Sequence, residues 1–326
     1  MSDENKIIYP WLAPIATDLD ALHRRGQLPH AILVHGPAGT GRRHLALWLC
    51  ARVLGAGEPD PALAGDPEAG IGLTEELLHP DLLVAQPPPD KRTLPIEVVR
   101  QLIGFLQLTA HQGAAKAAIL APAEAMSHSA ANSLLKTLEE PPAGSLIVLV
   151  TTAPGRLPAT VVSRCQCVRV ALPSADLASA WLEQTHRDAD WPRLLELAGG
   201  APLTALRLHE AGFSAEARRL EEELTALTRA EAEPVSVAQR WVKVGAPRCV
   251  DWLYRRTATE IRARSLAGEN AGTGSLQNPA DLLNISRLHT MLRELGELRR
   301  LAGSGLNMEL ALAQLLDGWY GAGAPR

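Results

Sequence analysis

The sequence has few cysteines, no long apolar run and no excess of positive charge, and each shortage excludes a class of protein. Four cysteines in 326 residues are too few and too scattered for a disulfide framework, so a reducing compartment fits. No uncharged apolar stretch reaches the roughly 18 residues expected of a membrane-spanning helix. The formal net charge of −4 gives nucleic acid no general attraction, which argues against a protein that binds DNA on its own.

No basic segment followed by an apolar stretch opens the chain, which begins MSDENKIIYPW. This start does not resemble a secretory signal peptide, so we expect a cytoplasmic protein without membrane contact. The sequence also has few residues at the spacing of metal ligands. Cys165 and Cys167 stand two apart, but two thiolates cannot complete a tetrahedral zinc site, and we expect both to be small, buried, apolar side chains.

Residues 31 to 171 alternate short apolar runs with helical segments, which is the pattern of a parallel sheet covered by helices. The expected strands are 31–35, 81–85, 117–121, 146–151 and 167–171. The expected helices between them are 42–54, 96–108 and 128–140. The Gly-, Pro- and Ala-rich stretch 55–72 has no periodicity, and we predict a surface loop there.

The strand signals stop after residue 172, and helical patterns follow. We predict three domains: an α/β domain over 1–172, a small helical domain over 173–212, and an all-helical domain over 213–326. Within the second domain we expect helices to break at Trp191-Pro192 and at Gly199-Gly200. In the third domain, the helical segments are 214–229, 236–244, 247–266, 280–302 and 307–319.

Residues 35–46, HGPAGTGRRHLA, keep the glycines of a phosphate-binding loop but lack its two active side chains. A working loop reads G-x-x-x-x-G-K-[ST], in which the lysine reaches the β- and γ-phosphates and the hydroxyl binds Mg²⁺. Gly36 and Gly41 are in register, but Arg42 and Arg43 follow them. Because a broad planar guanidinium is a poor substitute for a compact ammonium in a tight cradle, we expect both arginines to be solvated or paired with a neighbouring subunit.

The end of the third expected strand lacks the acidic pair that an ATPase of this kind needs, one carboxylate to hold Mg²⁺ and one to polarise the attacking water. Ala121 and Pro122 stand at these positions, and the nearest acid, Glu124, lies two or three residues further on. Lysine, hydroxyl and acidic pair are all missing. We therefore expect the chain to bind no nucleotide productively and to hold no cofactor of its own.

Four motifs follow one another along the N-terminal two-thirds of the chain: PHAILVHGPAGTG, HPDLL, SAANSLLKTLEEPP and LPATVVSRCQ. Together they resemble the clamp-loader branch of the AAA+ ATPases. The signature Ser163, Arg164, Cys165 beside a broken nucleotide site resembles, within that branch, the delta prime subunits of bacterial DNA polymerase III. The resemblance implies a RecA-like AAA+ domain with a five-stranded parallel sheet, a small helical lid, and a C-terminal helical collar that holds an oligomer together.

The same resemblance implies a stator-like subunit of a DNA-directed DNA polymerase holoenzyme that hydrolyses no ATP itself. Arg164 precedes the fifth expected strand, at the rim of the sheet domain, where a long planar cation can reach a phosphate bound by another chain. Such an arginine finger supplied in trans is worth about 10³- to 10⁵-fold in rate. The implied partners are gamma/tau and delta subunits and, through the complex, the sliding clamp and primed DNA. The ATP is expected to be bound by partner subunits and not by this chain.

The chain departs from the family in two places. A four-cysteine zinc module is expected after the helix that follows the phosphate loop, but Cys50 is the only cysteine in that region, so we predict no zinc. The lid helix is expected to present an arginine to nucleotide, but Leu203 and Thr204 occupy that neighbourhood.

Two other functions remain open on the sequence. An ATP-hydrolysing gamma/tau-like subunit with a variant phosphate loop predicts micromolar, Mg²⁺-dependent ATP binding by the isolated chain. A DNA-binding module that acts alone predicts tight, salt-sensitive DNA binding. For Arg164 itself, the alternative is an ordinary rim arginine paired with an acid.

Overall fold

The computed structural model describes residues 8–57, 79–88, 91, 93–112, 115–186, 189–267, 285–301 and 307–320. The chain divides into two compact units, Met1–Trp181 and Leu182–Arg326. The division falls inside helix α6, Ala175–Thr185. The division into three domains stays a prediction. In the part of the chain that the structure describes, no helix is long and apolar enough to cross a membrane.

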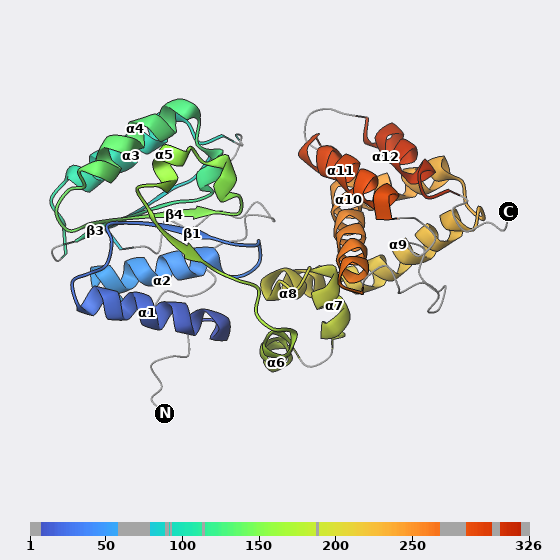
Figure 1. Ribbon diagram of the computed structural model, residues 1–326, viewed down its shortest axis with the longest axis horizontal. Helices are drawn as coiled ribbons and strands as arrows, with labels where there is room; N and C mark the ends of the chain where they lie inside the picture. Colours follow the sequence, from blue (N-terminus) through green and yellow to red (C-terminus); the bar gives the residue numbers. More distant parts are fainter. Residues whose placement is uncertain are drawn as a thin grey trace. The chain divides into compact units, whose positions relative to one another are not determined.

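The first unit is built on a five-stranded parallel sheet (Figure 1). Its strands are β1 Ala31–His35, β2 Leu82–Ala85, β3 Lys116–Leu120, β4 Ser145–Thr151 and β5 Gln166–Arg169. They lie in the order β2-β3-β4-β1-β5, with Leu33 of β1 opposite Leu149 on one side and Cys167 on the other. The central strands are buried, because helices cover both faces, which explains their continuous apolar sequences.

Helices cover the two faces of this sheet (Figure 1). On one face, α2 (Arg42–Leu54) contacts the sheet and α1 (Ala13–Arg24) packs on α2. On the other face lie α3 (Ile96–Gln107), α4 (His128–Glu139) and the short α5 (Ala159–Val162). A buried apolar cluster joins α3 and α4 to the sheet, so the loops at the strand ends are carried by a rigid core.

A buried ion pair fixes the start of β2 to β3. Asp81 is fully buried, and its carboxylate accepts hydrogen bonds from the Lys116 ammonium at 3.0 Å and from the backbone N–H groups of His111 and Gln112, each at 2.7 Å. The ammonium also lies over the Phe105 ring, 4.0 Å from its centroid. Every charge in this cluster therefore has a partner, as burial requires.

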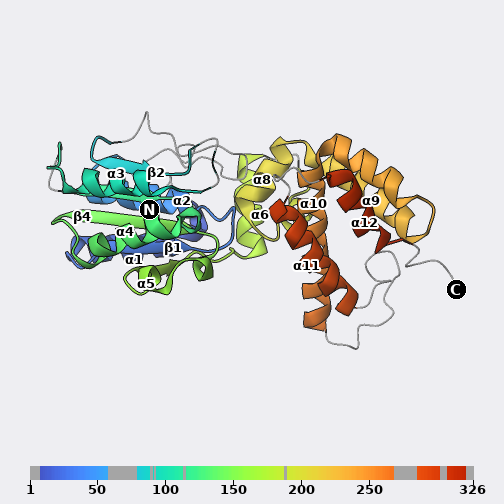
Figure 2. The same cartoon turned by 90° about the horizontal axis from the view of Figure 1, so that it is seen from above.

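The second unit is helical. It contains α7 Trp191–Leu197, α8 Pro202–Glu210, α9 Phe213–Thr228, α10 Pro234–Ala267, α11 Ile285–Leu301 and α12 Met308–Asp317. The long helix α10 packs against α11 and α12 (Figure 2). Trp241 and Trp252 meet edge to face in the core, with ring centroids 5.8 Å apart.

The predicted breaks between helices agree with the structure, and one helix was missed. The break expected at Trp191-Pro192 separates α6 from α7, and these two residues form the first turn of α7, where proline is tolerated because the first turn needs no N–H donor. The expected helices 236–244 and 247–266 are the two helical segments of α10, which is interrupted at Gly245 by non-helical backbone with φ 128° and ψ 90°. Helix α1 was not anticipated. Residues 280–284 and 302 of the expected helix 280–302, and 58–72 of the expected loop 55–72, lie outside the described residues.

Candidate functional site

The loop between β1 and α2 keeps the tight geometry of a phosphate-binding turn. It lies at the carboxyl end of β1 and leads into the N-terminus of α2, where α/β folds place phosphates. A Cβ atom on Gly36 would lie 2.0 Å from the Val170 carbonyl oxygen, so only glycine fits. Gly41 precedes α2 in the left-handed region, with φ 84°. The two glycines that the sequence placed in register therefore adopt backbone conformations that require glycine.

Arg42 is buried against this loop. Its side chain is buried, with 8% of its surface exposed, and Nε donates a hydrogen bond to the Pro37 carbonyl oxygen at 3.1 Å. The Thr40 hydroxyl donates to the same oxygen at 2.8 Å. The expectation that Arg42 is solvated or paired with another subunit is therefore wrong for this residue, because the loop itself provides an acceptor and buries the apolar stem. Arg43 is half-buried.

Glu124 supplies the negative charge near Arg42. Burial lowers the pKa of Arg42, and the Glu124 carboxylate opposes that lowering. Burial also acts to raise the pKa of Glu124, but hydrogen bonds from the hydroxyls of Thr152 and Thr151 outweigh it, so this pKa lies below its usual value. Oε1 of Glu124 accepts from the Thr152 hydroxyl at 2.6 Å and from its N–H at 3.1 Å. An ionised counter-charge from the segment after β3 thus lies near the loop.

The positions of the missing acidic pair are apolar in the structure as well. Ala121 is fully buried, and its N–H donates to the Ala85 carbonyl oxygen at 3.0 Å. Pro122 follows it and leads into the short helix Ala123–Ala125 that carries Glu124. The nearest carboxylate therefore belongs to Glu124, which is held by the end of β4.

Aromatic side chains from distant parts of the chain cover the same loop. The Trp11 indole N–H donates to the Thr40 carbonyl oxygen at 2.9 Å. The rings of Tyr9 and Trp11 stack with centroids 5.0 Å apart, and the Trp181 ring meets each of them edge-on. A Cβ on Gly41 would lie 2.7 Å from the Tyr9 ring, so this aromatic cluster lies directly against the loop.

Arg164 lies at the turn between α5 and β5, and β5 is an edge strand of the sheet. Its guanidinium is engaged within the chain. Nε donates to Oε1 of Glu139 at 2.8 Å, Nη2 also donates to that oxygen, and Nη1 donates to the Thr160 carbonyl oxygen at 2.9 Å. The side chain is 35% exposed. Pairing with an acid, which the sequence left open as the alternative for this residue, is thus the arrangement seen here.

The residues beside Arg164 differ in exposure. Ser163 is exposed, and its hydroxyl donates to the Thr160 carbonyl oxygen at 3.3 Å. Cys165 is half-buried, and burial raises the pKa of its thiol to about 11. Cys167 is exposed, so the expectation of a buried thiol is wrong there, because its strand lies at the sheet edge. Among the described residues, no three His, Cys, Asp or Glu side chains form a possible metal site.

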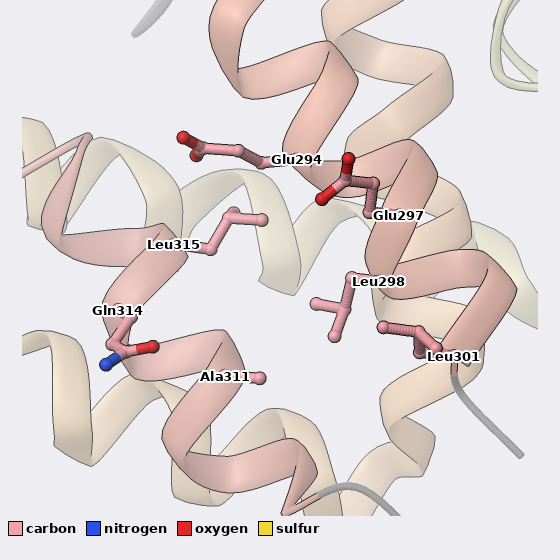
Figure 3. Close-up of a pocket in the computed structure, with 7 residues that line it drawn as sticks. All are labelled: Glu294, Glu297, Leu298, Leu301, Ala311, Gln314 and Leu315. Carbon is pink, nitrogen blue, oxygen red and sulfur yellow. The ribbon is translucent and has the colours of Figure 1, made fainter. Parts of the chain in front are cut away.

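The second unit has a pocket of its own between α11 and α12 (Figure 3). Its volume is about 330 Å³, and side chains from both helices point into it. The lining residues are Glu294, Glu297, Leu298, Leu301, Ala311, Gln314 and Leu315. The lining combines carboxylates, an amide and apolar side chains.

Comparisons with known proteins assign the family. A family model described as "DNA polymerase III, delta subunit" matches residues 13–174. DNA polymerase III subunit delta' of Pseudomonas aeruginosa is 34% identical over 270 residues, which cover 82% of this chain and 81% of that protein. The chain belongs to the DNA polymerase III delta prime family. Subunit delta' of Escherichia coli is 30% identical over 315 residues, 94% of each of the two chains.

A solved structure shares the fold of this delta prime family member. The crystal structure of a DNA polymerase III gamma subunit-related protein from Thermotoga maritima aligns with a TM-score of 0.51 at 19% identity. The alignment covers 91% of this chain and 97% of that one. With the five-stranded parallel sheet and the helical C-terminal region, the likeness confirms the predicted AAA+ fold class.

Sequence reasoning missed four side chains that form the site. Tyr9, Trp11 and Trp181 come together only in the fold, although the first two lie in a YPW run in a chain whose residues are only 4% aromatic. Glu139 was seen as part of the LLKTLEEPP motif, but nothing in the spacing pairs it with Arg164.

Proposed function

We propose that this member of the delta prime family is a stator-like clamp-loader subunit that hydrolyses no ATP itself and supplies Arg164 to the ATP site of a neighbouring subunit. The observation that carries the proposal is the state of the chain's own phosphate loop. Arg42 stands where a working site has its lysine, and its side chain is buried and bonded to the Pro37 carbonyl oxygen.

Loss of hydrolysis follows from what the loop lacks. Phosphoryl transfer depends on positioning and on charge stabilisation by lysine, Mg²⁺ and a residue that orients the nucleophile. Arg42 and Arg43 replace the lysine and the hydroxyl, and Ala121 and Pro122 replace the acidic pair. The aromatic cluster of Tyr9, Trp11 and Trp181 adds apolar bulk against the loop. A nucleotide bound in this loop would find Arg42 in place of the lysine and no hydroxyl to bind its Mg²⁺.

Arg164 has properties that a finger acting on another chain requires. It lies next to an edge strand, is partly exposed, and presents five N–H donors in a rigid plane suited to phosphate oxygens. Its present partner, Glu139, lies on the same exposed surface. Solvent therefore weakens the ion pair, and a phosphate can replace the Glu139 carboxylate. A guanidinium at this rim therefore serves a phosphate held outside the chain better than one in its own loop.

The proposed partners follow from the family. The relatives are named as subunits of DNA polymerase III. We infer that this chain assembles with gamma/tau and delta subunits to load the sliding clamp on primed DNA, and that the ATP is bound by partner subunits. The helical second unit, with its α11–α12 pocket, provides a surface for subunit contacts in the predicted collar. We propose no zinc, although most of the segment after α2, residues 58–78, lies outside the described part of the chain.

The test is ATP turnover by the reconstituted complex containing Arg164→Ala. We expect normal assembly by gel filtration and a fall in turnover of about 10³-fold at one site, seen as loss of that site's share of the total rate. ATP turnover with Arg164→Lys should fall similarly, because lysine keeps the charge but loses the planar donors. Arg24→Ala is the matched control, since Arg24 is an exposed arginine of α1 paired with Asp20. Unchanged turnover in Arg164→Ala would remove the finger assignment.

An ATP-hydrolysing, gamma/tau-like role is the second candidate, because the loop backbone is intact. It requires Arg42 to leave the Pro37 carbonyl oxygen and to act as the phosphate-binding cation. Mg²⁺-dependent ATP hydrolysis by the isolated chain would favour this role.

A further inference from the structure

The Arg164 guanidinium is held on the edge that a phosphate would use. Its Nε and Nη2 form the edge that binds an oxyanion through two parallel N–H bonds. In the structure both nitrogens donate to Oε1 of Glu139, and Nη1 donates to the Thr160 carbonyl oxygen. A carboxylate oxygen thus occupies the place of a phosphate oxygen.

Glu139 is placed for this contact by its helix. It is the last residue of α4, which ends before Pro141-Pro142, and α4 packs against α5. Arg164 follows α5 by two residues, and the N–H of Arg164 donates to the Val161 carbonyl oxygen at 3.1 Å. Both side chains therefore start from fixed backbone, and the contact needs no loop rearrangement.

The exposure of the pair limits how firmly it holds. Glu139 is 51% exposed and Arg164 35%, so solvent screens the attraction. Pairs of this kind shift an equilibrium by a factor of only about 1.4 to 5. An arginine finger is worth about 10³- to 10⁵-fold in rate, and that gain is made in the transition state. Glu139 can therefore hold the guanidinium in the ground state and still release it to a reacting phosphoryl group.

We propose that Glu139 is a positioning residue that keeps Arg164 withdrawn from the neighbouring ATP site until a phosphate displaces it. The inference rests on the proposed function of Arg164 as a finger. It assigns to Glu139 a restraint on basal turnover: while the guanidinium is on Glu139, it is absent from the neighbour's site. No covalent step is involved, since one ion pair is exchanged for another.

The experiment compares ATP turnover of reconstituted complexes, without clamp or DNA, that contain the wild-type chain, Glu139→Gln, Arg164→Ala or the double variant. Glutamine keeps the size of the side chain and removes its charge. We expect Glu139→Gln to raise basal kcat about 1.4- to 5-fold, with the KM for ATP little changed. In the Arg164→Ala background the same substitution should have no effect, as a coupled pair requires.

Glu140→Gln is the matched control, because Glu140 is the next residue and is also exposed. It should leave basal turnover unchanged. Glu139→Ala, which removes the remaining acceptor too, should raise turnover at least as much as Glu139→Gln, and it replaces Glu139→Gln should that variant fail to assemble. A merely structural role of Glu139 predicts a lower rate, not a higher one.

The outcomes separate the two ideas. Unchanged or reduced turnover in the Glu139 variants, together with a strong loss in Arg164→Ala, would overturn the restraint and leave the finger in place. A rise that persists in the double variant would also overturn it. No loss in Arg164→Ala would contradict the proposed function itself, and the restraint with it.

Discussion

Replacing Trp11 with alanine should destabilise the first unit by about 3–5 kcal/mol, the usual loss for removing a buried tryptophan. Trp11 is 8% exposed and stacks on Tyr9, and the Trp181 ring lies edge-on to it with ring centroids 5.3 Å apart. The substitution removes these ring contacts and leaves the Thr40 carbonyl oxygen without its indole donor. The cost falls on the phosphate loop, because Thr40 is part of it.

The assay is a thermal melt of the full chain followed by circular dichroism. In a unit of about 150–250 residues, each kcal/mol moves Tm by about 2–4 °C, so the first unit should melt about 6–20 °C lower. Trp11→Phe is the matched control. It keeps an aromatic ring but loses the N–H donor, and should cost only about 1–3 kcal/mol.

Two results would refute this reasoning. A Trp11→Ala chain that melts within 2 °C of wild type, on the order of a surface substitution, would show that the aromatic cluster does not hold the loop. A phenylalanine variant as unstable as the alanine variant would place the whole effect in one hydrogen bond rather than in packing.

Two further predictions concern buried and exposed polar groups. Asp81→Asn should cost about 3–5 kcal/mol at pH 7, because it leaves the Lys116 ammonium buried without its charged partner. Burial acts to raise the pKa of Asp81, but the N–H groups of His111 and Gln112 and the Lys116 ammonium outweigh it and lower it. The stabilisation by the Asp81 carboxylate is therefore complete above the unfolded pKa of about 3.9 and declines as pH falls below it. If the difference in urea midpoint between Asp81→Asn and wild type stays the same down to pH 2, this prediction is wrong. Of the four cysteines, only Cys167 is exposed, so a thiol reagent at pH 8 should modify one thiol per native chain, and Cys167→Ser should abolish that rapid labelling.

The sheet and most helices could be predicted from the sequence because their signals are local. Each expected strand overlaps an observed one within two residues, since buried parallel strands are continuous apolar runs bounded by turns. The break between the expected helices 236–244 and 247–266 is likewise present, as non-helical backbone at Gly245. Helix α1, Ala13–Arg24, was not anticipated and shows the limit of such local signals.

The site was only partly predictable because its decisive contacts join distant residues. The glycine register and the missing acids are local patterns and could be read directly. The direction of the Arg42 side chain could not, because a long arginine can reach solvent or fold back, and the Pro37 carbonyl oxygen decides between them. The meeting of Trp11 with Trp181, and of Arg164 with Glu139, depends on the packing of α6, α4 and α5.

Equilibrium titration of the isolated full-length chain with fluorescent ATP and Mg²⁺ tests the central claim most directly. The claim is that the chain's own phosphate loop, with Arg42 in place of the lysine, serves no nucleotide. We predict no saturable, Mg²⁺-dependent binding up to millimolar ATP. Stoichiometric binding with a micromolar Kd, lost on replacing Arg42, would contradict it.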